Sequence, residues 1–292
     1  MQRIEFLKLS SLSFLGLYSC GISHSIKQNK CLAIQLYTIR GAISQNLEKA
    51  LEKIAALGFK DLEIYGYDGT FFGKNRNEFQ SILNNTGLKV ISSHHRTGIT
   101  DKDEGTLLKN WENTLDDLNY IGAKYAVCSY LPEAERSLQN YRKLPEVLEN
   151  AGKTSKQNGI KLAYHNHDFE FLKMDDQKNF YDFILENTSP DLVKMELDLY
   201  WIAKAGFDPL AYFKKYPGRF PLWHVKDMQK ETKNFAEIGN GTIDFKRIFE
   251  AREKAGLEYW FIEQDSSERD IFESILMSKK YVESHSFFFN KK

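Results

Sequence analysis

The chain has 292 residues, of which 42% are hydrophobic, 27% charged and 14% aromatic. This composition is typical of a soluble globular protein and excludes a disordered or collagen-like chain. Forty basic residues balance forty acidic ones, so the net charge gives no indication of a nucleic acid or an anionic membrane as partner. Three cysteines cannot build a disulfide framework, so a hydrophobic core must hold the fold.

The N-terminal segment has the pattern of an export signal. Arg3 and Lys8 flank the start of an apolar run, residues 9–18, which is too short to cross a bilayer. The run ends in Leu17-Tyr18-Ser19-Cys20, which resembles the lipobox of bacterial lipoproteins, whose cysteine is acylated. We therefore expect residues 1–30 to be a signal peptide and polar tether, and the protein to be exported, as a periplasmic protein or as a lipoprotein anchored through Cys20. The alternative is a plain N-terminal extension.

A repeated pattern organises the rest of the chain. In five places a glycine follows a segment with helical periodicity and precedes a short β-type run. We expect each glycine to end a helix with positive φ and a strand to begin directly after it. The five glycines are Gly58, Gly87, Gly122, Gly159 and Gly256.

Three further runs, 32–39, 192–199 and 220–225, also have strand character, which makes eight predicted strands. Their continuous apolar character predicts parallel strands buried on both faces. Eight units give roughly 34 residues each, close to the roughly 30 of a strand, a helix and their connections. The sequence therefore predicts a single-domain α/β fold, a (β/α)8 TIM barrel over residues 31–285, followed by a C-terminal tail, 286–292, that packs on the last helix.

A doubly wound open sheet is the alternative architecture. Its dinucleotide-binding form has a glycine-rich turn after the first strand. Here the first strand is followed by Arg40-Gly41-Ala42-Ile43-Ser44, which lacks that motif. The barrel is therefore the favoured fold.

Histidines gather at the ends of the predicted strands. In a barrel of this type the loops that follow the strands open onto one shared mouth, where the active site lies. Histidine has no general preference for strand ends, so the pattern points to a functional site. The five histidines in such positions, out of seven in the chain, are His94, His95, His165, His167 and His224.

Two carboxylates occupy equivalent positions, Asp198 and Glu263. Together with His165 and His224 they would offer two imidazoles and two carboxylates to one point. This donor set suits Mn²⁺, Co²⁺, Zn²⁺ or Mg²⁺, with the mixed nitrogen and oxygen ligands favouring the transition metals. Each histidine taken alone could equally be a hydrogen-bonded, half-buried ring.

Other polar residues have simpler interpretations. Lys194 and Glu196 alternate with Asp198 on one strand face, and we expect them to form a buried ion pair. Glu63 is interpreted in the same way. The segment Gly239-Asn240-Gly241 is expected to be a turn, with Asp244 capping a helix that begins at Phe245.

Several motifs together resemble the xylose isomerase-like superfamily, specifically its sugar phosphate isomerase/epimerase group. The resemblance runs from about Cys31 to the last helix. It implies a (β/α)8 barrel whose mouth holds a divalent metal through residues of strands five to eight, which here are His165, Asp198, His224 and Glu263. The motifs are Gln35-Leu36-Tyr37-Thr38-Ile39-Arg40, Leu197-Asp198, His224-Val225-Lys226-Asp227, Gly239-Asn240-Gly241-Thr242-Ile243-Asp244-Phe245 and Ile262-Glu263.

The chain departs from the epimerase pattern at one position. The resemblance implies a glutamate on strand five that works with the strand-eight glutamate as an acid/base pair, whereas this chain has His165 before Asn166-His167. A histidine can bind metal and move a proton. The change favours one-base chemistry, such as elimination, over the symmetric two-carboxylate mechanism.

These residues suggest an enzyme that removes a proton α to the carbonyl of a sugar. Glu263 is the expected general base, His165 or His167 the partner acid, and Lys226 the group that polarises a substrate oxygen. We expect His94 and His167 to bind substrate at the rim. The aromatic rings expected to stack on the sugar are Tyr37, Trp201, Tyr65 and Phe169.

Four functions remain open on the sequence alone. The first is a metal-dependent isomerase or epimerase of free or keto sugars, and the second is a lyase or dehydratase of keto sugars or keto-glycosides. The third is a non-catalytic carbohydrate-binding barrel, and the least favoured is an endonuclease IV type of DNA repair enzyme, because the net charge is zero. Expected export and the lack of an arginine cluster argue against sugar phosphates. Homo-oligomerisation is left open.

Overall fold

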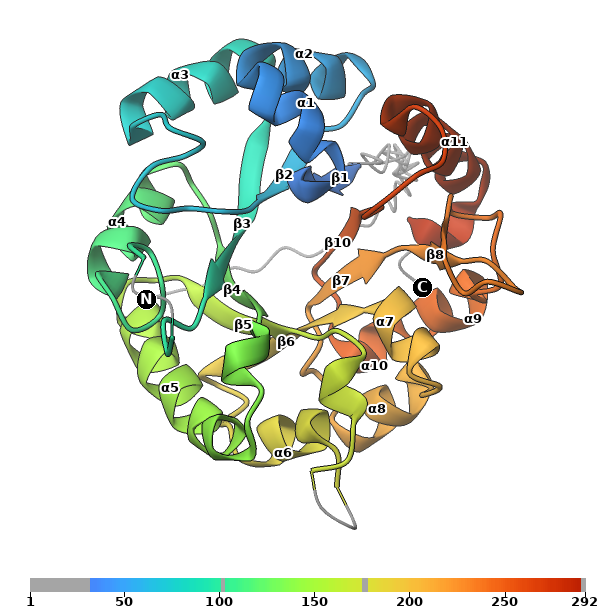
Figure 1. Cartoon of the computed structure of the whole chain (residues 1–292). Helices are drawn as coiled ribbons and strands as arrows, with labels where there is room; N and C mark the ends of the chain where they lie inside the picture. Colours follow the sequence, from blue (N-terminus) through green and yellow to red (C-terminus); the bar gives the residue numbers. More distant parts are fainter. Residues whose placement is uncertain (1–31, 101–102, 175–177, 290–292) are drawn as a thin grey trace, which may run out of the picture.

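The chain forms a closed barrel of parallel strands surrounded by helices (Figure 1). The computed structural model describes residues 32–100, 103–174 and 178–289, so the expected signal peptide, tether and Cys20 anchor lie outside the described residues. The prediction of a single-domain TIM barrel is confirmed. The barrel strands of the described residues are β1 (Ala33–Gln35), β2 (Asp61–Ile64), β3 (Lys89–Arg96), β4 (Tyr125–Tyr130), β5 (Lys161–His165), β6 (Val193–Asp198), β7 (Leu222–Val225) and β10 (Tyr259–Ile262), and β10 pairs with β1 to close the ring.

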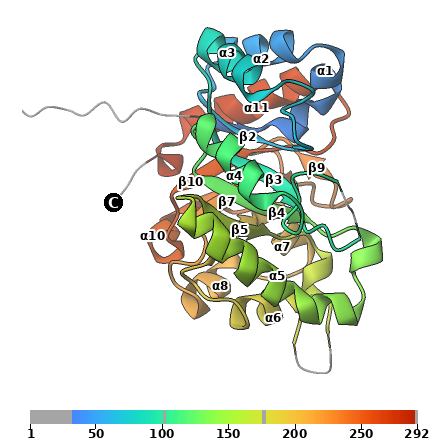
Figure 2. The same cartoon turned by 90° about the vertical axis from the view of Figure 1, so that its left-hand side faces the viewer.

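The helices cover the outside of the barrel, as the side view in Figure 2 shows for α4, α5 and α6. Within the described residues no helix is both long enough and apolar enough to cross a bilayer. The helices are α1 (Arg40–Gln45), α2 (Leu47–Ala56), α3 (Arg76–Thr86), α4 (Trp111–Tyr120), α5 (Leu138–Gln157), α6 (Phe180–Glu186), α7 (Leu199–Lys204), α8 (Pro209–Lys215), α9 (Phe245–Glu250), α10 (Arg252–Ala255) and α11 (Ile271–Ser284), with 3₁₀ turns at Leu36–Ile39, Glu133–Glu135, Phe169–Phe171 and Ser286–Phe288.

The predicted local signals are found where the sequence placed them. All five repeat glycines have positive φ, from 68° at Gly87 to 91° at Gly58, as expected for residues that end a helix. Asp244 caps α9 by accepting a hydrogen bond from the backbone N–H of Arg247. The first strand is shorter than predicted. The Gln35 side chain accepts a hydrogen bond from the backbone N–H group of Tyr37, and a 3₁₀ turn begins at Leu36.

Two apolar layers fix the barrel. The larger layer lies between the strands and the helices. The smaller one fills the barrel interior and forms a floor on which the polar residues of the strand ends rest, as in other barrels of this kind. The residues of the inner layer are Ala33, Ile91, Tyr125, Val127, Ala163, Leu222 and Phe261.

The described part of the C-terminal tail, residues 286–289, packs against this core. Phe288 is 1% exposed, and its ring lies 4.8 Å from that of Phe249 and 5.4 Å from that of Trp260. Its contact with Tyr281 of α11 is longer, 6.2 Å between ring centroids. The tail therefore packs mainly on α9 and β10, and the prediction that it packs on the last helix is only partly right.

A register shift in β3 changes which of its side chains face inward. Leu62 of β2 is paired with Val90, but the next residue, Glu63, is paired with Ser92, so Ile91 is an extra residue in β3. Side chains alternate along a strand, and one extra residue reverses the alternation beyond it. As a result Ser92 and His94 lie on the inner side with Glu63.

A short antiparallel hairpin follows β7. It consists of β8 (Asp227–Met228) and β9 (Phe235–Ala236), and the turn at Gly239-Asn240-Gly241 comes after it, as predicted. The Asp227 carboxylate accepts hydrogen bonds from the backbone N–H groups of Met228, Gly239, Gly241 and Ile243. This carboxylate therefore holds the hairpin and the turn against the end of β7.

Candidate active site

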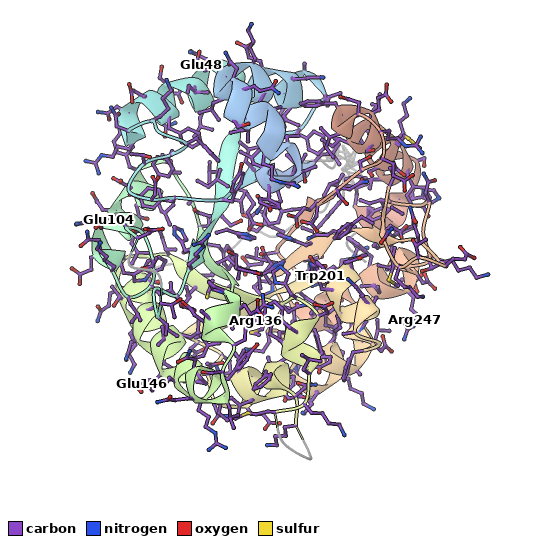
Figure 3. All side chains as sticks on the ribbon, in the orientation of Figure 1. Glu48, Glu104, Arg136, Glu146, Trp201 and Arg247 are labelled. Carbon is purple, nitrogen blue, oxygen red and sulfur yellow. The ribbon has the colours of Figure 1, made fainter. Side chains whose placement is uncertain are left out.

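A cavity of about 910 Å³ opens at the carboxyl ends of the barrel strands. In the axial view of Figure 3, Trp201 lies near the centre of the ring, whereas Glu48 lies on its outer edge. The cavity is lined by every residue predicted to bind substrate or to catalyse the reaction, but Asp198 and His224 lie beneath its surface, fully buried. The predicted residues that line it are Tyr37, His94, His165, His167, Trp201, Lys226 and Glu263.

Asp198, His224 and Glu263 form a group at the floor of the cavity, here called the mouth cluster. His224 Nδ1 lies 2.5 Å from Glu263 Oε2 and 3.8 Å from Asp198 Oδ2. The fourth predicted ligand, His165, faces the same group with Nε2 at 3.8 Å from Asp198 Oδ2. The structure thus brings together the four residues that the sequence predicts as metal ligands.

Lys226 is embedded among the carboxylates of this group. Its Nζ lies 2.9 Å from Asp198 Oδ2, 2.6 Å from Glu263 Oε2 and 3.0 Å from Asp265 Oδ2. Burial opposes charge on the ammonium group, but these carboxylates hold the pKa of Lys226 well above its usual value. Despite its burial, Glu263 has a lowered pKa because of Lys226 and His224.

Sequence reasoning missed Asp265. Its carboxylate lines the cavity, and its pKa is raised to about 6 by burial and by the neighbouring carboxylates Glu263 and Asp198, against the opposing effect of Lys226. Asp265 stands two residues after Glu263, the spacing at which side chains of an extended segment share a face. That spacing could have identified it.

A second group lies deeper in the barrel and consists of Glu63, His94 and Glu196, here called the deep cluster. His94 Nε2 lies 2.9 Å from Glu63 Oε1 and 2.8 Å from Glu196 Oε2. The imidazoles of His165 and His224 reach it from above, with His165 Nδ1 at 3.1 Å and His224 Nε2 at 3.2 Å from Glu196 Oε2. These two rings therefore stand between the two clusters.

The deep cluster corrects the expected Lys194–Glu196 pair and shows that the buried partners of Glu63 are histidines. Glu196 does not pair with Lys194, whose charged neighbours are instead Arg219, Asp191, Lys161 and Glu258, because Lys194 lies one pleat further down the barrel. Glu63 also has no lysine partner in the described residues. It accepts hydrogen bonds from Gln35 Nε2 and Ser92 Oγ and pairs with His94 and His224, whose charges hold its pKa low despite burial.

His94 and His95 are separated by the strand alternation. Burial disfavours the charged form of His94, but Glu63 and Glu196 raise its pKa to about 9. Its side chain is 11% exposed at the floor of the cavity, below the rim. His95 points away from the two clusters and packs on Trp111, although it lies at the outer part of the cavity lining. Its Nδ1 lies 2.9 Å from the carbonyl oxygen of Gly105, and burial lowers its pKa to about 4.

The histidines of the β5 segment are held neutral. Burial and the nearby charge of His224 keep the pKa of His165 well below its usual range, and burial together with Lys226 lowers the pKa of His167 to about 3. The ring of His167 stacks on Phe169, with 5.4 Å between centroids. Both imidazoles are therefore neutral, each can donate a hydrogen bond through its N–H group, and neither rests as an imidazolium.

The cavity wall combines aromatic rings with arginines. Tyr37, Tyr65, Tyr130, Trp201 and Phe235 line it. Three arginines, Arg40, Arg96 and Arg136, line it as well. Arg40 stacks on Tyr37 at 4.3 Å and Arg136 on Phe169 at 3.6 Å, so both guanidinium groups are held in place at the wall.

The donor atoms of the mouth cluster fit a divalent cation. Asp198 Oδ2, His224 Nδ1 and Glu263 Oε2 are buried, and their contacts among the described residues are ion pairs with Lys226 and with one another rather than well-aligned hydrogen bonds. The three atoms lie within 4.8 Å of one another. One imidazole and two carboxylates are a ligand set that transition metals accept.

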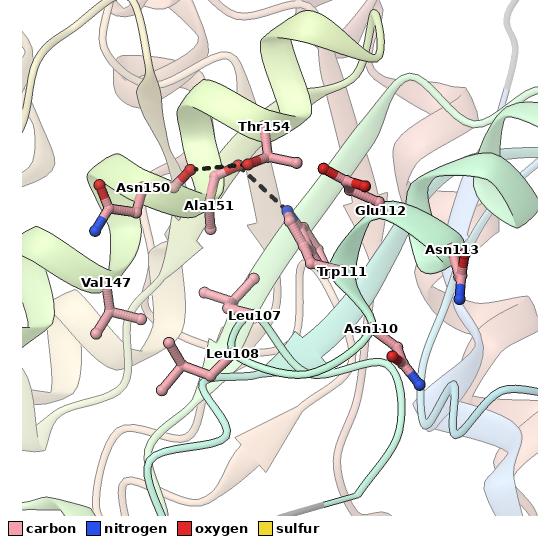
Figure 4. Close-up of a pocket in the computed structure, with 10 residues that line it drawn as sticks. All are labelled: Leu107, Leu108, Asn110, Trp111, Glu112, Asn113, Val147, Asn150, Ala151 and Thr154. Atoms are coloured by element: carbon pink, nitrogen blue, oxygen red, sulfur yellow. Dashed lines mark hydrogen bonds between the residues drawn. The ribbon is translucent and has the colours of Figure 1, made fainter.

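A second cavity, of about 400 Å³, lies on the outside of the barrel between α4 and α5 (Figure 4). There Trp111 Nε1 donates hydrogen bonds to the carbonyl oxygen of Ala151 and to Ser155 Oγ. Glu112 is the one titratable residue among the described residues that line it. This groove therefore lacks the convergent polar groups of a catalytic site.

Sequence comparison relates the chain to a family of enzymes. The model of the xylose isomerase-like TIM barrel family matches residues 51–281. Inosose dehydratase from Lacticaseibacillus casei is 25% identical over 271 residues, covering 81% of this chain and 89% of the relative. Inosose dehydratase from Clostridium beijerinckii is 25% identical over 278 residues, covering 82% and 90%.

Solved structures show the same fold. A sugar phosphate isomerase/epimerase from Parabacteroides distasonis superposes with a TM-score of 0.77 at 26% identity, covering 90% of this chain and 97% of that one. The IolI protein with a bound zinc atom superposes with a TM-score of 0.71 at 17% identity, covering 89% and 100%. The chain therefore belongs to the xylose isomerase-like TIM barrel family and is an enzyme of that superfamily.

Proposed function

We propose that this protein is a divalent-metal-dependent lyase that removes a proton α to the carbonyl of a keto sugar or related keto-polyol and then expels a β-substituent. The observation that carries the proposal is the asymmetry of the cavity floor. One side carries the carboxylates Asp198 and Glu263 in ion-pair contact with Lys226, whereas β5 and the residues directly after it contribute neutral imidazoles. Such a site has a carboxylate base on one face of the substrate only, which suits elimination.

The metal would be held by Asp198, His224 and Glu263, with His165 facing it through Nε2. When bound, a divalent cation would polarise the substrate carbonyl and stabilise the negative charge that develops on its oxygen. Three protein ligands leave coordination positions for substrate, the pattern of catalytic metal sites.

The proton is removed by a carboxylate at the floor of the cavity. Glu263 is ionised at neutral pH, and Asp265 is ionised above about pH 6, so both can accept it. The Lys226 ammonium group lies between them and would stabilise charge on a substrate oxygen. The neutral N–H group of His167 would donate a hydrogen bond to the departing oxygen.

The bonds change in a balanced way. The C–H bond α to the carbonyl breaks and its electron pair forms a C=C bond, while the β C–O bond breaks and the oxygen leaves as water, or as an alcohol from a glycoside, after taking up a proton. The relatives named inosose dehydratase support this type of outcome. The cavity of about 910 Å³ has room for a substituent larger than a hydroxyl group.

Isomerisation or epimerisation is the second candidate. The protonated form of the carboxylate base could return the proton to a neighbouring carbon, and the Parabacteroides distasonis protein is described as a sugar phosphate isomerase/epimerase. The arginines of the cavity wall make phosphorylated sugars necessary members of any substrate panel.

The two reactions can be separated with one assay in D₂O. The purified chain, loaded with Mn²⁺ or Co²⁺, is incubated with inososes, keto sugars, their phosphates and keto-glycosides, and products are followed by NMR. The proposal predicts metal-dependent α-proton exchange with release of water or alcohol. Exchange with carbonyl migration or inversion and no released fragment would instead establish isomerisation. Metal binding without exchange on any ketone would refute both reactions.

A further inference from the structure

We propose that the barrel holds a second divalent cation, bound in the deep cluster by His94 Nε2, His165 Nδ1 and Glu196. This inference does not depend on the reaction that the enzyme catalyses. It takes the mouth-cluster ion of the proposed function as its neighbour, and the experiment below distinguishes the failure of one from the failure of the other.

The deep cluster converges on one oxygen atom. Imidazole nitrogens from His94, His165 and His224 lie 2.8, 3.1 and 3.2 Å from Glu196 Oε2, and the four donor atoms lie within 4.8 Å of one another. Ligand atoms that share a tetrahedral metal at 2.0–2.1 Å lie about 3.3 Å apart. The spacing around Glu196 is therefore close to that of a coordination shell.

Hydrogen bonding alone leaves this arrangement incomplete. Glu196 is fully buried, yet its Oε1 has no hydrogen-bond partner in the described part of the chain. A buried carboxylate oxygen without a hydrogen-bond partner costs free energy. Glu196 therefore has an oxygen atom that can still bind a cation.

The two bridging imidazoles allow both clusters to be filled together. A neutral imidazole has one lone pair, so it serves one metal at a time. His224 directs Nδ1 to the mouth cluster, and its Nε2 can donate to Glu63 Oε1 at 2.5 Å. His165 directs Nδ1 to the deep cluster. Each ion would then have three protein ligands, and the hydrogen bond to Glu63 would fix the orientation of the His224 ring.

Charge balance supports a second cation. Glu63, Glu196, Asp198 and Glu263 are all buried, and Asp265 lies at their edge. Against these five carboxylates, Lys226 is the one permanent cation that the described residues place in ion-pair contact with them. Protons on His94 and His224 balance part of this negative charge in the metal-free protein, and a second divalent cation would take their place when it binds. The number of ions bound per chain therefore tests the proposal.

The ligand set indicates the class of metal. Two imidazoles and one carboxylate favour Mn²⁺, Fe²⁺, Co²⁺ or Zn²⁺ over Mg²⁺ and Ca²⁺, which prefer oxygen ligands. Co²⁺ is the most useful probe, because its visible absorption reports the geometry of its site without any enzyme assay.

The experiment counts ions in the untagged chain. The protein is stripped with a chelator, equilibrated with Co²⁺, desalted and analysed for metal per chain, and the visible spectrum is recorded during the titration. We expect two Co²⁺ ions per chain. His94→Gln and Glu196→Gln should each weaken binding of one ion 10-fold to 100-fold or more and leave the second, whereas Asp198→Asn should remove only the mouth ion.

His95→Gln is the matched control, because it changes the adjacent histidine, which points away from the cluster. This variant should bind two ions, and thermal melts should show that every variant is folded. One ion per wild-type chain, lost in Asp198→Asn and kept in His94→Gln, would overturn the second site and leave the proposed function intact. No bound ion would overturn both. One ion lost only in the deep-cluster variants would support the deep site and overturn the mouth site.

Discussion

The ammonium group of Lys226 keeps three carboxylates together at the floor of the cavity. Without a cation at this position, Asp198, Glu263 and Asp265 would repel one another in a site that water reaches poorly. Lys226 stands two residues after His224, so the strand alternation places both side chains on the inner face. This residue thus links the electrostatics of the mouth cluster to the substrate cavity above it.

At the scale of single residues, Glu263 provides the first test. Glu263→Gln removes the carboxylate base and should lower kcat by about 100-fold to 10,000-fold, with little change in the melting temperature because the shapes are similar. Glu258→Gln is the control, since Glu258 lies just before the opposite end of β10 and pairs with Lys161. Steady-state kinetics and α-proton exchange measure the effect. If the Glu263→Gln protein exchanged the α-proton of the substrate at the wild-type rate, Glu263 would be excluded as the base.

Glu170 provides a pH-dependent test. Its Oε1 accepts a hydrogen bond from the hydroxyl group of Tyr164, and its Oε2 accepts one from the backbone N–H group of His167. Burial raises its pKa to about 7, against the lowering effect of these hydrogen bonds and of Arg136. The folded state therefore holds a proton that the unfolded state has lost above about pH 4.5, so this group makes the protein less stable as the pH rises from about 4.5 to 7.

Glu170→Gln removes that titration. Relative to wild type, the variant should gain stability between pH 5 and pH 8 by up to about 3 kcal/mol, the equivalent of roughly two pKa units. Urea unfolding at the two pH values measures the difference. An equal offset at both pH values would show that the Glu170 carboxyl group does not titrate in this range.

The residue scale also shows where sequence reasoning succeeds and where it stops. Asp198, His224 and Glu263 were predictable because each ends a strand, and strand ends meet at the mouth in any barrel. The partners of Glu63 and Glu196 were not predictable. They depend on side chains from several strands, of which His224 lies 161 residues from Glu63, and on how deep each side chain lies, which alternation does not specify.

At the scale of elements, the turn after the β8–β9 hairpin is held by one carboxylate. A methyl group added at Gly241 would meet the Asp227 carboxylate and the backbone carbonyl of Met228. Gly241→Ala should therefore displace the turn and lower the free energy of unfolding by about 1–3 kcal/mol. Because Phe235 of this hairpin lines the cavity, KM should rise as well.

Gly41→Ala is the matched control for this prediction. Gly41 lies in α1, and no atom lies near the position of an added methyl group. Alanine is the better helix former, so this variant should be neutral or more stable by up to about 1 kcal/mol. Thermal unfolding compares the two. A Gly241→Ala protein as stable as wild type would mean that Asp227 does not fix the turn.

Element boundaries were harder to predict than element order. The glycine pattern located the strands after Gly58, Gly87, Gly122, Gly159 and Gly256, because a helix that ends in a left-handed residue turns back toward the sheet. The end of β1 was missed, because the cap that Gln35 supplies to Tyr37 is a local hydrogen bond that competes with the strand. The residues Gln35-Leu36-Tyr37 have β propensity, and propensity alone does not reveal the side-chain hydrogen bond that ends the strand.

At the scale of the whole molecule, the acidic and basic side chains are equal in number but unevenly distributed. The forty acidic and forty basic residues cancel overall, yet the barrel interior concentrates carboxylates around Lys226. The cavity should therefore attract cations and exclude polyanions such as DNA.

The location of the protein is a separate prediction. We propose that the chain is exported and that Cys20 becomes an acylated N-terminus. Mass spectrometry of protein from the native membrane fraction should find a lipid-modified peptide that starts at Cys20, and Cys20→Ser should release the protein from that fraction. A mature chain with an unmodified Cys20 would exclude the lipoprotein, and retention of residues 1–19 would exclude cleavage of a signal peptide.

The extra residue in β3 has a wider consequence. A strand's alternation behaves like a reading frame, and Ile91 acts as a one-residue insertion that changes the frame for everything downstream. In the unshifted frame, Ile91, Ser93 and His95 would face the barrel axis and His94 would face the helices. A comparison that aligns relatives by the His94-His95 pair alone would therefore equate side chains that point in opposite directions, and a graft of this site onto another barrel must carry the insertion with it.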